Sequence, residues 1–407
     1  MINKNGKSNK HSLAIILLLF IFLSNCNQPV LNKLETSNSP KTSWMMLPFV
    51  KDTTTFPILK TDSTTLFHCP ATNTDVKWEG TYVFNPAAIV RNNKVYLIYR
   101  GEDNIGVYGG TSRIGIAESE DGFTFKKSPK PIIYPDNDPY LEFEKDGGCE
   151  DPRIVESEDG TYVVTYTAFN GTLARLCIAT SKDLIKWQKH GLAFGKAKSG
   201  IYRDLWSKSG SIICKRVSDK IIATKINGKY WMYWGETDIY LATSDNLIDW
   251  EPVVKEEKTG KRLSKYLGNG HYDIQFAKPQ TYLKTALEIR EKRFDSELVE
   301  PGPPAILTDN GIFFIYNGSN SGSSGDPDLK AGEYTVGQAL FDINDPSALI
   351  GRCENYFLRS QNSIEVSGQM SNTMFVEALV HFKNRWIIYY VTGEANIGVA
   401  YCDASFD

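Results

Sequence analysis

The run GGCEDPRIV, residues 147–155, places two adjacent carboxylates at the start of an apolar, alternating stretch. Glu150 and Asp151 are followed by a proline and by Arg153. Two carboxylates that flank a glycosidic bond are the usual machinery for its cleavage: one donates a proton to the leaving oxygen, and the other activates water or attacks the sugar. Arg153 shares a strand face with Asp151, because side chains alternate, and we predict that it braces the site rather than contacting substrate.

Further acids occur at the ends of other strand-like stretches, far apart in the chain. They are Asp103, Glu236, Glu300 and Glu394. Taken singly, such an acid is more often solvated or paired with an arginine such as Arg100 or Arg113. Several acids from equivalent positions of a repeat would instead converge on one site.

Other chemistries receive little support. The chain has no G-x-S-x-G elbow, and the glycines of residues 106–115 do not have the spacing of a phosphate loop. A formal net charge of -3 argues against nucleic acid as a partner, and five scattered histidines without a CxxC pair argue against a zinc site. We therefore expect neither a metal nor a cofactor.

The elements that must position these acids form a repeat. Five units each contain a strand, a polar turn and a second strand rich in Tyr, Trp, Val and Ile, and the first three add a hairpin of the S-x-D-x-x-x-W/F type. The units begin with residues 87–101, 151–171, 220–236, 303–320 and 377–394. Antiparallel units at this period predict an all-β fold, a five-bladed β-propeller. Residues 281–295 are the best candidate for an inserted helix.

In a propeller, the first strand of each blade lines the axis, so equivalent positions converge at one end. The converging segments are Asn85 with Pro86, then 150–153, 207–211 with Lys225, 300–304 and 372–377. The ends of the second strands add Arg100, Glu102, Asp103, Asn170, Glu236, Asn317 and Glu394. We predict a polar, acid-rich funnel.

The N-terminal residues predict export. Lysines precede the apolar run LAIILLLFIFL, which has the length of a signal-peptide core, and the run ends in LSNC at Cys26. We expect residues 1–26 to be a lipoprotein signal peptide with Cys26 lipidated, residues 27–45 to be a flexible tether, and residues 46–407 to be the propeller. The protein would face the periplasm or the cell surface. An ordinary signal peptide with a stray cysteine is the alternative.

Six cysteines remain, and their even number permits disulfides in an exported protein. They are Cys69, Cys149, Cys177, Cys214, Cys353 and Cys402. Several lie within apolar strand-like runs, so buried free thiols are at least as well supported.

Several stretches together resemble glycoside hydrolase family 130, the β-mannoside phosphorylases and β-mannosidases. They include NPAAIV, YLIYRGED, EFEKDGGCEDPRI, YVVTYTAFNG, EPGPPAI and IIYYVTGEANIGVA. The resemblance implies a five-bladed propeller in which Asp151 is the general acid, acting through a hydroxyl of the mannosyl ring. It also implies that Asn85 and Arg100 hold the sugar at the cleavage point, and that Glu394 or Asn396 holds it from the last blade.

The departures from the family pattern favour water over phosphate. Where phosphorylases place basic residues, this chain has Glu236 and Glu300, and its third blade reads Ser-Lys-Ser at 207–209. Carboxylates repel phosphate and suit the activation of water. We predict an inverting β-mannosidase acting on β-1,2-linked mannose oligosaccharides, with Asp151, Glu236 and Glu300 as catalytic residues. The predicted substrate-binding residues are Asn85, Arg100, Asp103, Arg113, Glu150, Asn170, Lys225 and Glu394.

Two alternatives remain open. One is a phosphorylase that binds phosphate through Lys208, Lys225 or Arg203. The other is a non-catalytic glycan-binding lipoprotein of the cell surface.

Overall fold

β-Branched and aromatic residues alternate along most of the strands, which favours pleated, half-buried structure. The computed structural model describes residues 44–105, 110–255, 265–268, 271–273, 282–361, 365, 372–393 and 396–403. These residues belong to one compact unit, Ser43–Asp407. The predicted signal peptide, Cys26, nearly all of the predicted tether and Glu394 lie outside the described residues.

The strands form the predicted all-β fold, a five-bladed β-propeller. Blade 1 consists of β4 (Tyr82–Arg91), β5 (Lys94–Glu102), β6 (Ser112–Ser119) and β7 (Lys126–Lys127). Blade 2 consists of β8 (Gly148–Glu156), β9 (Tyr162–Phe169), β10 (Ala174–Ser181) and β11 (Gln188–Leu192). Blade 3 consists of β12 (Ser211–Val217), β13 (Lys220–Ala223), β14 (Lys225–Ile226), β15 (Lys229–Trp234), β16 (Ile239–Ser244) and β17 (Trp250–Pro252).

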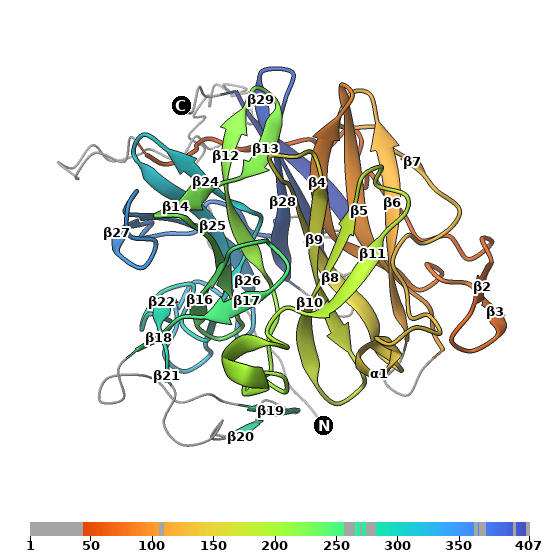
Figure 1. Cartoon of the computed structure of the whole chain (residues 1–407). Coiled ribbons are helices and arrows are strands. Elements are labelled where there is room, and N and C mark those ends of the chain that lie inside the picture. The colour runs from red at the N-terminus through yellow and green to blue at the C-terminus, as the bar shows by residue number, and fades with distance from the viewer. Residues whose placement is uncertain are drawn as a thin grey trace, which may run out of the picture. The chain divides into compact units, whose positions relative to one another are not determined.

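Blade 4 consists of β23 (Leu298–Pro301), β24 (Ala305–Thr308), β25 (Gly311–Ser319), β26 (Tyr334–Phe341) and β27 (Leu349–Arg352). Blade 5 consists of β28 (Met374–Phe382), β29 (Arg385–Thr392), β30 (Asn396–Cys402) and β1 (Val50–Lys51). The inner strands β4, β8, β12 and β28 run through the middle of Figure 1, and the outer strands β7 and β27 lie towards its two edges.

The ring is closed by the two ends of the described chain. β1 pairs antiparallel with β30, with Val50 opposite Tyr401 and Lys51 opposite Ala400. The N-terminal strand thus supplies the outermost strand of the last blade. Loss of this pairing would leave an unpaired edge on β30.

A bulge at the same level of the inner strands creates the positions that face the axis. The register shifts between Phe84 and Ala87, between Glu150 and Arg153, and between Val376 and Ala378. In blades 1 to 3, Asn85, Asp151 and Ser209 adopt positive φ values of 47°, 47° and 56°. This conformation is uncommon for non-glycine residues, and here it turns three polar side chains towards one place.

A buried tyrosine recurs on the second strand of every blade. The five are Tyr99, Tyr166, Tyr233, Tyr316 and Tyr390. In four blades its hydroxyl donates to a carboxylate that precedes the blade, and a cation of the fourth strand pairs with that carboxylate. These tyrosine–carboxylate–cation triads are Tyr99–Glu79–Lys127, Tyr166–Glu144–Lys189, Tyr316–Asp295–Arg352 and Tyr390–Glu365–Lys51.

Close packing around these tyrosines requires glycine on the neighbouring strand in three blades. At Gly115, opposite Tyr99, an added Cβ would lie 2.5 Å from the Trp78 ring and 2.6 Å from that of Tyr99. The hydrophobic clusters between successive blades are built on these contacts, so the blades are fixed relative to one another.

The helix predicted for residues 281–295 is wrong for the described part of that range. Residues 282–283 form β21 (Tyr282–Leu283), which pairs with β18 (Val254–Lys255), and β22 (Thr285–Leu287) pairs with β16. Pairing with neighbouring strands outweighs the local helical preference here. The remaining elements are β2 (Phe67–Cys69), β3 (Thr74–Val76), β19 (Lys265–Gly268), β20 (His271–Asp273), the helix α1 (Leu141–Glu144) and the 3-10 turn η1 (Ala197–Gly200).

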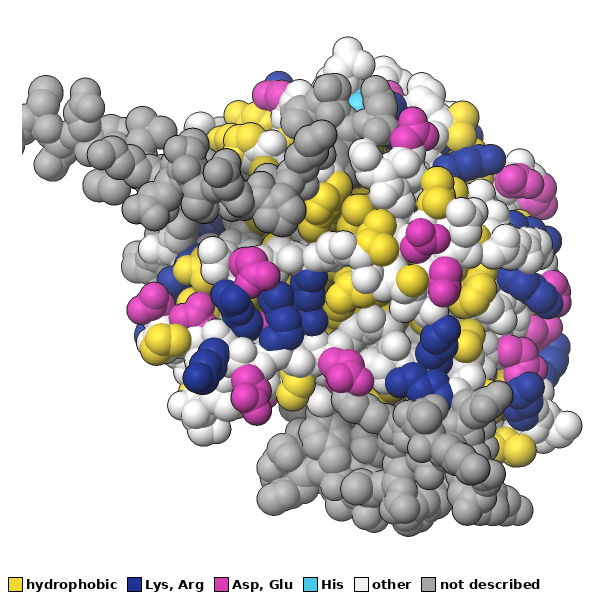
Figure 2. All heavy atoms as spheres, turned by 90° about the vertical axis from the view of Figure 1, so that its left-hand side faces the viewer, with side chains coloured by type: hydrophobic (Ala, Val, Ile, Leu, Met, Phe, Trp, Pro, Cys, Tyr) yellow, Lys and Arg dark blue, Asp and Glu magenta, His cyan; other side chains and the backbone are white. Residues whose placement is uncertain are grey.

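The cysteines agree with the second of the two alternatives drawn from the sequence, buried free thiols. The six cysteines after Cys26 are all buried and free. On the face drawn in Figure 2, lysine and arginine side chains are interspersed with aspartate and glutamate. Neither described helical segment has the length and apolar composition needed to cross a membrane.

Candidate active site

Arg100, at the end of β5, gathers three carboxylates at the axis. Its guanidinium donates to Asp151 Oδ1 at 3.0 Å, to Glu150 Oε1 at 2.9 Å and to Glu102 Oε2 at 2.9 Å. Asn85 Nδ2 donates to the same Asp151 oxygen at 2.7 Å. The predicted sugar-binding pair, Asn85 and Arg100, therefore converges on the predicted acid.

Lys208, on the segment before β12, forms a second centre. Its ammonium lies 3.8 Å from Asp151 Oδ2 and 3.8 Å from Glu236 Oε1. The two carboxylate oxygens are thus within twice that distance of each other. Trp206 Nε1 donates to the other oxygen of Glu236 at 3.1 Å, and the Ser209 hydroxyl donates to Glu300.

Arg153 connects three blades beneath these groups. It is 1 % exposed and donates to the backbone carbonyls of Asp151 at 3.1 Å and Pro301 at 2.8 Å. It also lies 3.0 Å from Glu377 Oε1, although neither oxygen of Glu377 accepts a hydrogen bond from any residue that the structure describes. These contacts agree with the predicted bracing role.

The two adjacent acids of blade 2 differ in protonation. Burial, and then the charge of Asp151, raise the pKa of Glu150 to about 7. Burial opposes ionisation of Asp151 too, but Arg100, Lys208 and Arg153 outweigh it and hold its pKa below the usual range. Below about pH 7 the pair therefore retains one proton, carried by Glu150, while Asp151 is ionised.

Glu300, another acid near Lys208, also has a raised pKa. Burial, together with the charge of Glu236, raises the pKa of Glu300 to about 7. The surrounding acids raise the pKa of the Lys208 ammonium well above its usual value, although burial opposes this. Glu377 is fully buried, and burial raises its pKa strongly. Six carboxylates thus share three cations at the axis: Glu102, Glu150, Asp151, Glu236, Glu300 and Glu377 with Arg100, Arg153 and Lys208.

Some predicted substrate contacts lie elsewhere. Asp103 and Arg113 are each 1 % exposed and bind one another at 2.7 Å, so they form a buried ion pair of blade 1. Asn170 caps a turn by accepting hydrogen bonds from the backbone of Thr172 and Leu173. The structure does not bring these three side chains to the Arg100–Lys208 cluster.

Lys225 is exposed, and its ammonium lies 4.9 Å from the centre of the Tyr230 ring. It begins the outer hairpin of blade 3, at the end of the blade remote from Glu236. Among the described residues, no group of three or more His, Cys, Asp or Glu side chains is arranged to hold a metal ion.

Three contributors were missed as site residues by sequence reasoning. Lys208 was considered only as an alternative phosphate ligand, Trp206 was given no role, and Glu377 was placed only as the end of the converging segment 372–377. The signal for all three was positional: Lys208 lies within the blade 3 segment 207–211, Trp206 directly precedes that segment, and Glu377 stands at the bulge of blade 5. Glu377 occupies the bulge position that Asn85 and Asp151 occupy in blades 1 and 2, whereas Trp206 and Lys208 lie just before Ser209, the corresponding residue of blade 3.

Comparison with known proteins agrees with this geometry. The sequence model of a family described as β-1,4-mannooligosaccharide phosphorylase matches residues 50–405. A 1,2-β-oligomannan phosphorylase of Thermoanaerobacter sp. (strain X514) is 30% identical over 333 residues, which are 80% of this chain and 90% of that protein.

Solved structures are similar over most of their length. A glycosyl hydrolase from Bacteroides ovatus is 41% identical with a TM-score of 0.81, covering 89% of this chain and 95% of that one. A second structure is described with the finding that the family contains glycoside hydrolases that target β-1,2 mannosidic linkages in Candida mannan. It is 40% identical with a TM-score of 0.81 over 89% and 95% of the two chains. The chain belongs to glycoside hydrolase family 130.

Proposed function

We propose that this protein hydrolyses β-1,2-mannosidic bonds with inversion, using water rather than phosphate as the nucleophile. The observation that carries the proposal is the pair of carboxylates, Glu236 and Glu300, beside Lys208. A phosphate dianion placed there would compete for the single Lys208 ammonium with the Glu236 carboxylate and, as the pH rises through 7, with the Glu300 carboxylate. Like charges a few Å apart in a partly dry site repel strongly, whereas a water molecule can donate to either carboxylate.

The acid side of the reaction rests on Glu150 and Asp151. Asn85 and Arg100 hold the sugar at the cleavage point against Asp151. Because Asp151 is held ionised, we assign the reserve proton to the Glu150–Asp151 pair. That proton passes to a hydroxyl of the sugar ring, and the hydroxyl gives its own proton to the leaving glycosidic oxygen as the bond to the anomeric carbon breaks.

On the base side, Glu236 is the better candidate for the group that deprotonates water. It is oriented by Trp206 and Lys208, whereas Glu300 is bound by Ser209 and has a pKa raised to about 7 by burial. Asp151 Oδ2 and Glu236 Oε1 lie within twice 3.8 Å of each other.

The test is to incubate the protein with β-1,2-mannobiose with and without inorganic phosphate. Hydrolysis predicts free mannose at a rate independent of phosphate, with the α-anomer formed first in the NMR spectrum. Replacement of Glu236 by Gln should abolish this turnover, whereas the Asp103→Asn variant should retain it in its folded fraction. Mannose 1-phosphate that appears only with phosphate would overturn the proposal.

Phosphorolysis is the second candidate, because the relatives identified by sequence are phosphorylases and Lys208 is a cation in the funnel. It predicts that the same assay consumes phosphate and that Lys208→Met raises the KM for phosphate. A non-catalytic glycan-binding protein predicts no turnover at all, with glycan binding retained in both wild type and Asp151→Asn.

We also propose that the protein is an exported lipoprotein anchored through Cys26. The basis is the apolar run that ends at this cysteine. Replacing Cys26 with Ser should move the protein from the membrane fraction to the soluble one and abolish labelling by a fatty-acid probe. An unchanged distribution would contradict the anchor.

A further inference from the structure

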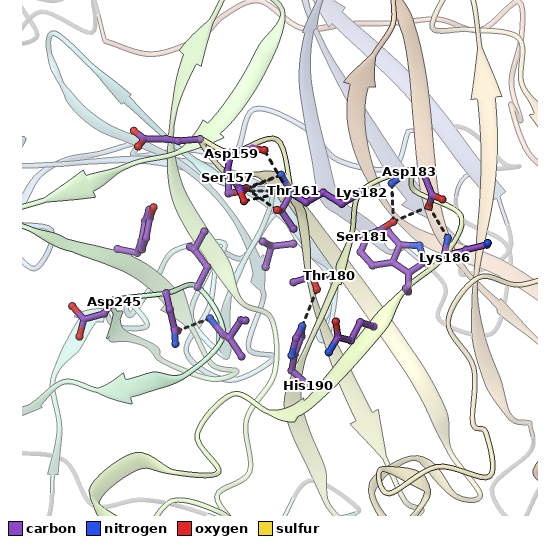
Figure 3. A pocket seen from close by; sticks show the side chains of 18 residues that line it. Ser157, Asp159, Thr161, Thr180, Ser181, Lys182, Asp183, Lys186, His190 and Asp245 are labelled. Atoms are coloured by element: carbon purple, nitrogen blue, oxygen red, sulfur yellow. Dashed lines mark hydrogen bonds and ion pairs between the residues drawn. The ribbon is translucent and has the colours of Figure 1, made fainter.

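A cleft of about 900 Å³ lies between blades 2 and 3, away from the Arg100–Lys208 cluster. The turn between β8 and β9, the hairpin between β10 and β11, and the hairpin between β16 and β17 form it. Figure 3 shows Asp245 on one side of the cleft and Lys182, Asp183 and Lys186 on the other, with Thr180 and His190 between them. A volume of this size lies within the range of small-ligand sites.

The cleft is separate from the catalytic funnel. Asp151 stands near the start of β8, whereas Ser157 follows the last residue of the same strand. Six residues of extended chain span about 20 Å. An oligosaccharide can therefore occupy the cleft while another part of the same polysaccharide, or another molecule, occupies the funnel.

The walls of the cleft come from the S-x-D-x-x-x-W/F hairpins noted in the sequence. In blades 2 and 3 the hairpins share one hydrogen-bond pattern: Ser181 and Ser244 each accept from a backbone amide, and Trp187 and Trp250 each donate to a leucine carbonyl at 3.1 Å. The tryptophans nevertheless differ in exposure, since Trp250 is 1 % exposed and Trp187 is only half-buried. The fold can bury this side chain, and in blade 2 it leaves the indole at the cleft.

A second aromatic ring lines the same cleft. Tyr230, at the start of β15, is half-buried, and Lys225 lies over its ring. Two half-exposed aromatic rings with restricted orientations offer flat apolar faces, while the polar residues around them offer hydroxyl, carboxylate and amide groups. This combination suits a pyranose, which has an apolar C–H face and a rim of hydroxyls.

The charge of the cleft selects against anions. Four carboxylates line it (Glu158, Asp159, Asp183 and Asp245), and three of them pair with a lysine: Lys215, Lys182 and Lys229, respectively, bind Glu158, Asp159 and Asp245. His190 adds no positive charge near neutral pH, because burial lowers its pKa. Paired charges present no uncompensated cationic group to a phosphorylated or otherwise acidic glycan, so neutral sugars are the class that fits.

We propose that this cleft is a second, non-catalytic binding site for a neutral polysaccharide, with Trp187 and Tyr230 as its stacking platforms. Its natural ligand rests on the proposed function: it is the mannan whose ends the funnel cleaves. Occupation of the cleft keeps the enzyme on the polymer between cleavage events and so raises the local concentration of chain ends.

The experiment measures retardation in native gels that contain yeast mannan, with Asp151→Asn in every variant so that the polymer stays intact. Trp187→Ala and Tyr230→Ala should each weaken the apparent affinity by roughly tenfold, in keeping with the loss of one stacking contact. Trp187→Phe should retain most of it. Ile185→Ala is the matched control, because Ile185 is 67% exposed on the same hairpin but does not line the cleft.

The catalytic readout separates this proposal from the proposed function. With Asp151 restored, Trp187→Ala and Tyr230→Ala should cleave β-1,2-mannobiose at the wild-type rate and cleave mannan more slowly. Wild-type retardation by both variants would overturn the cleft proposal whatever the enzyme hydrolyses. A different result would separate the two proposals in the other direction. If the wild type were retarded by mannan but turned over no β-mannoside, and both variants lost the retardation, the proposed function would fail and the cleft proposal would stand.

Discussion

Buried charges occur in two regions of this propeller, and the two are built on opposite plans. In the tyrosine–carboxylate–cation triads between the blades, each carboxylate has its own cation and a tyrosine hydroxyl. Glu144, for example, accepts from Lys189 at 2.6 Å and from Tyr166 at 2.7 Å. In the funnel, by contrast, Arg100 serves Glu102, Glu150 and Asp151, and Lys208 lies between that same Asp151 and Glu236.

The difference teaches how one repeat supplies both stability and reactivity. Both regions use equivalent positions of successive blades, so the chain builds each with the same backbone. Neutralised charges fix the blades in place, because a lone charge left behind by a mutation is costly. Burial raises the pKa of the triad carboxylates Glu79 and Glu144 as well. In the funnel the charges of Asp151 and Glu236 add to burial and raise the pKa of Glu150 and Glu300 to about 7, a range that suits acid–base chemistry.

The largest expected effect separates two aspartates of the same chain. Asp151→Asn should lower kcat/KM for β-1,2-mannobiose by about 10²–10⁴-fold, because it removes the charge on which Arg100 and Asn85 converge. Asp103→Asn is the control: it breaks the buried pair with Arg113 and should cost stability, while the folded fraction keeps its kcat. Equal loss of activity in both variants would show that the funnel is not a distinct region.

The triads should show the reverse pattern. Glu144→Gln removes the nearer of two carboxylates that bind Lys189 and leaves Asp138 at 3.1 Å, so we expect the free energy of unfolding to fall by about 1–3 kcal/mol. The kcat of the folded enzyme should not change. Urea unfolding and steady-state kinetics measure the two quantities, and Glu79→Gln in blade 1 repeats the test on an equivalent triad. A fall in kcat without loss of stability would contradict a structural role.

Removal of a crowded acid should stabilise the protein in a pH-dependent way. The pKa of Glu300 is raised from an ordinary 4.5 to about 7 by burial, so its stabilising contribution is complete below the unfolded value and is lost as the pH rises through 7. Glu300→Gln should therefore gain up to about 3 kcal/mol relative to wild type between pH 4.5 and 8. Urea unfolding at both pH values measures this gain. The exposed Glu120→Gln should show none.

Much of the fold could be predicted from sequence because it is local and repeated. The turns Arg91-Asn92-Asn93-Lys94 and their counterparts identify the hairpins, and five hairpins give the number of blades. The helix expected for residues 281–295 could not be rejected in this way, since the strands β21 and β22 exist only through pairing with β18 and β16. Those partners lie about 30 to 45 residues earlier and are not visible in the local pattern.

The sequence predicts a site residue well where its position in the strand register brings it to the axis. It predicts less well where the direction of a long side chain decides which groups it contacts. Asn85, Arg100 and Asp151 follow from the repeat and from the resemblance to family 130. Asp103 lies on the same short segment, yet its side chain points to Arg113 in the interior. Lys208 was undervalued because its importance comes from two acids in other segments, Asp151 and Glu236, and a linear sequence does not show their distance.

The smallest expected effect comes from comparing a triad with blade 3, where the described residues show no tyrosine–carboxylate–cation triad. In blade 3, Tyr233 donates to the carbonyl of Pro346 at 2.8 Å instead of to a carboxylate. A hydrogen bond to a charged group contributes about 1.5–3 kcal/mol and one to a neutral group about 0.5–1.5 kcal/mol. Tyr166→Phe should therefore lower the free energy of unfolding more than Tyr233→Phe, although each substitution removes one hydroxyl group from a buried tyrosine. An equal loss of unfolding free energy in the two variants would contradict this. It would mean that the hydrogen bond from Tyr166 to Glu144 adds nothing to the ion pair with Lys189, and that the buried tyrosines contribute through packing alone.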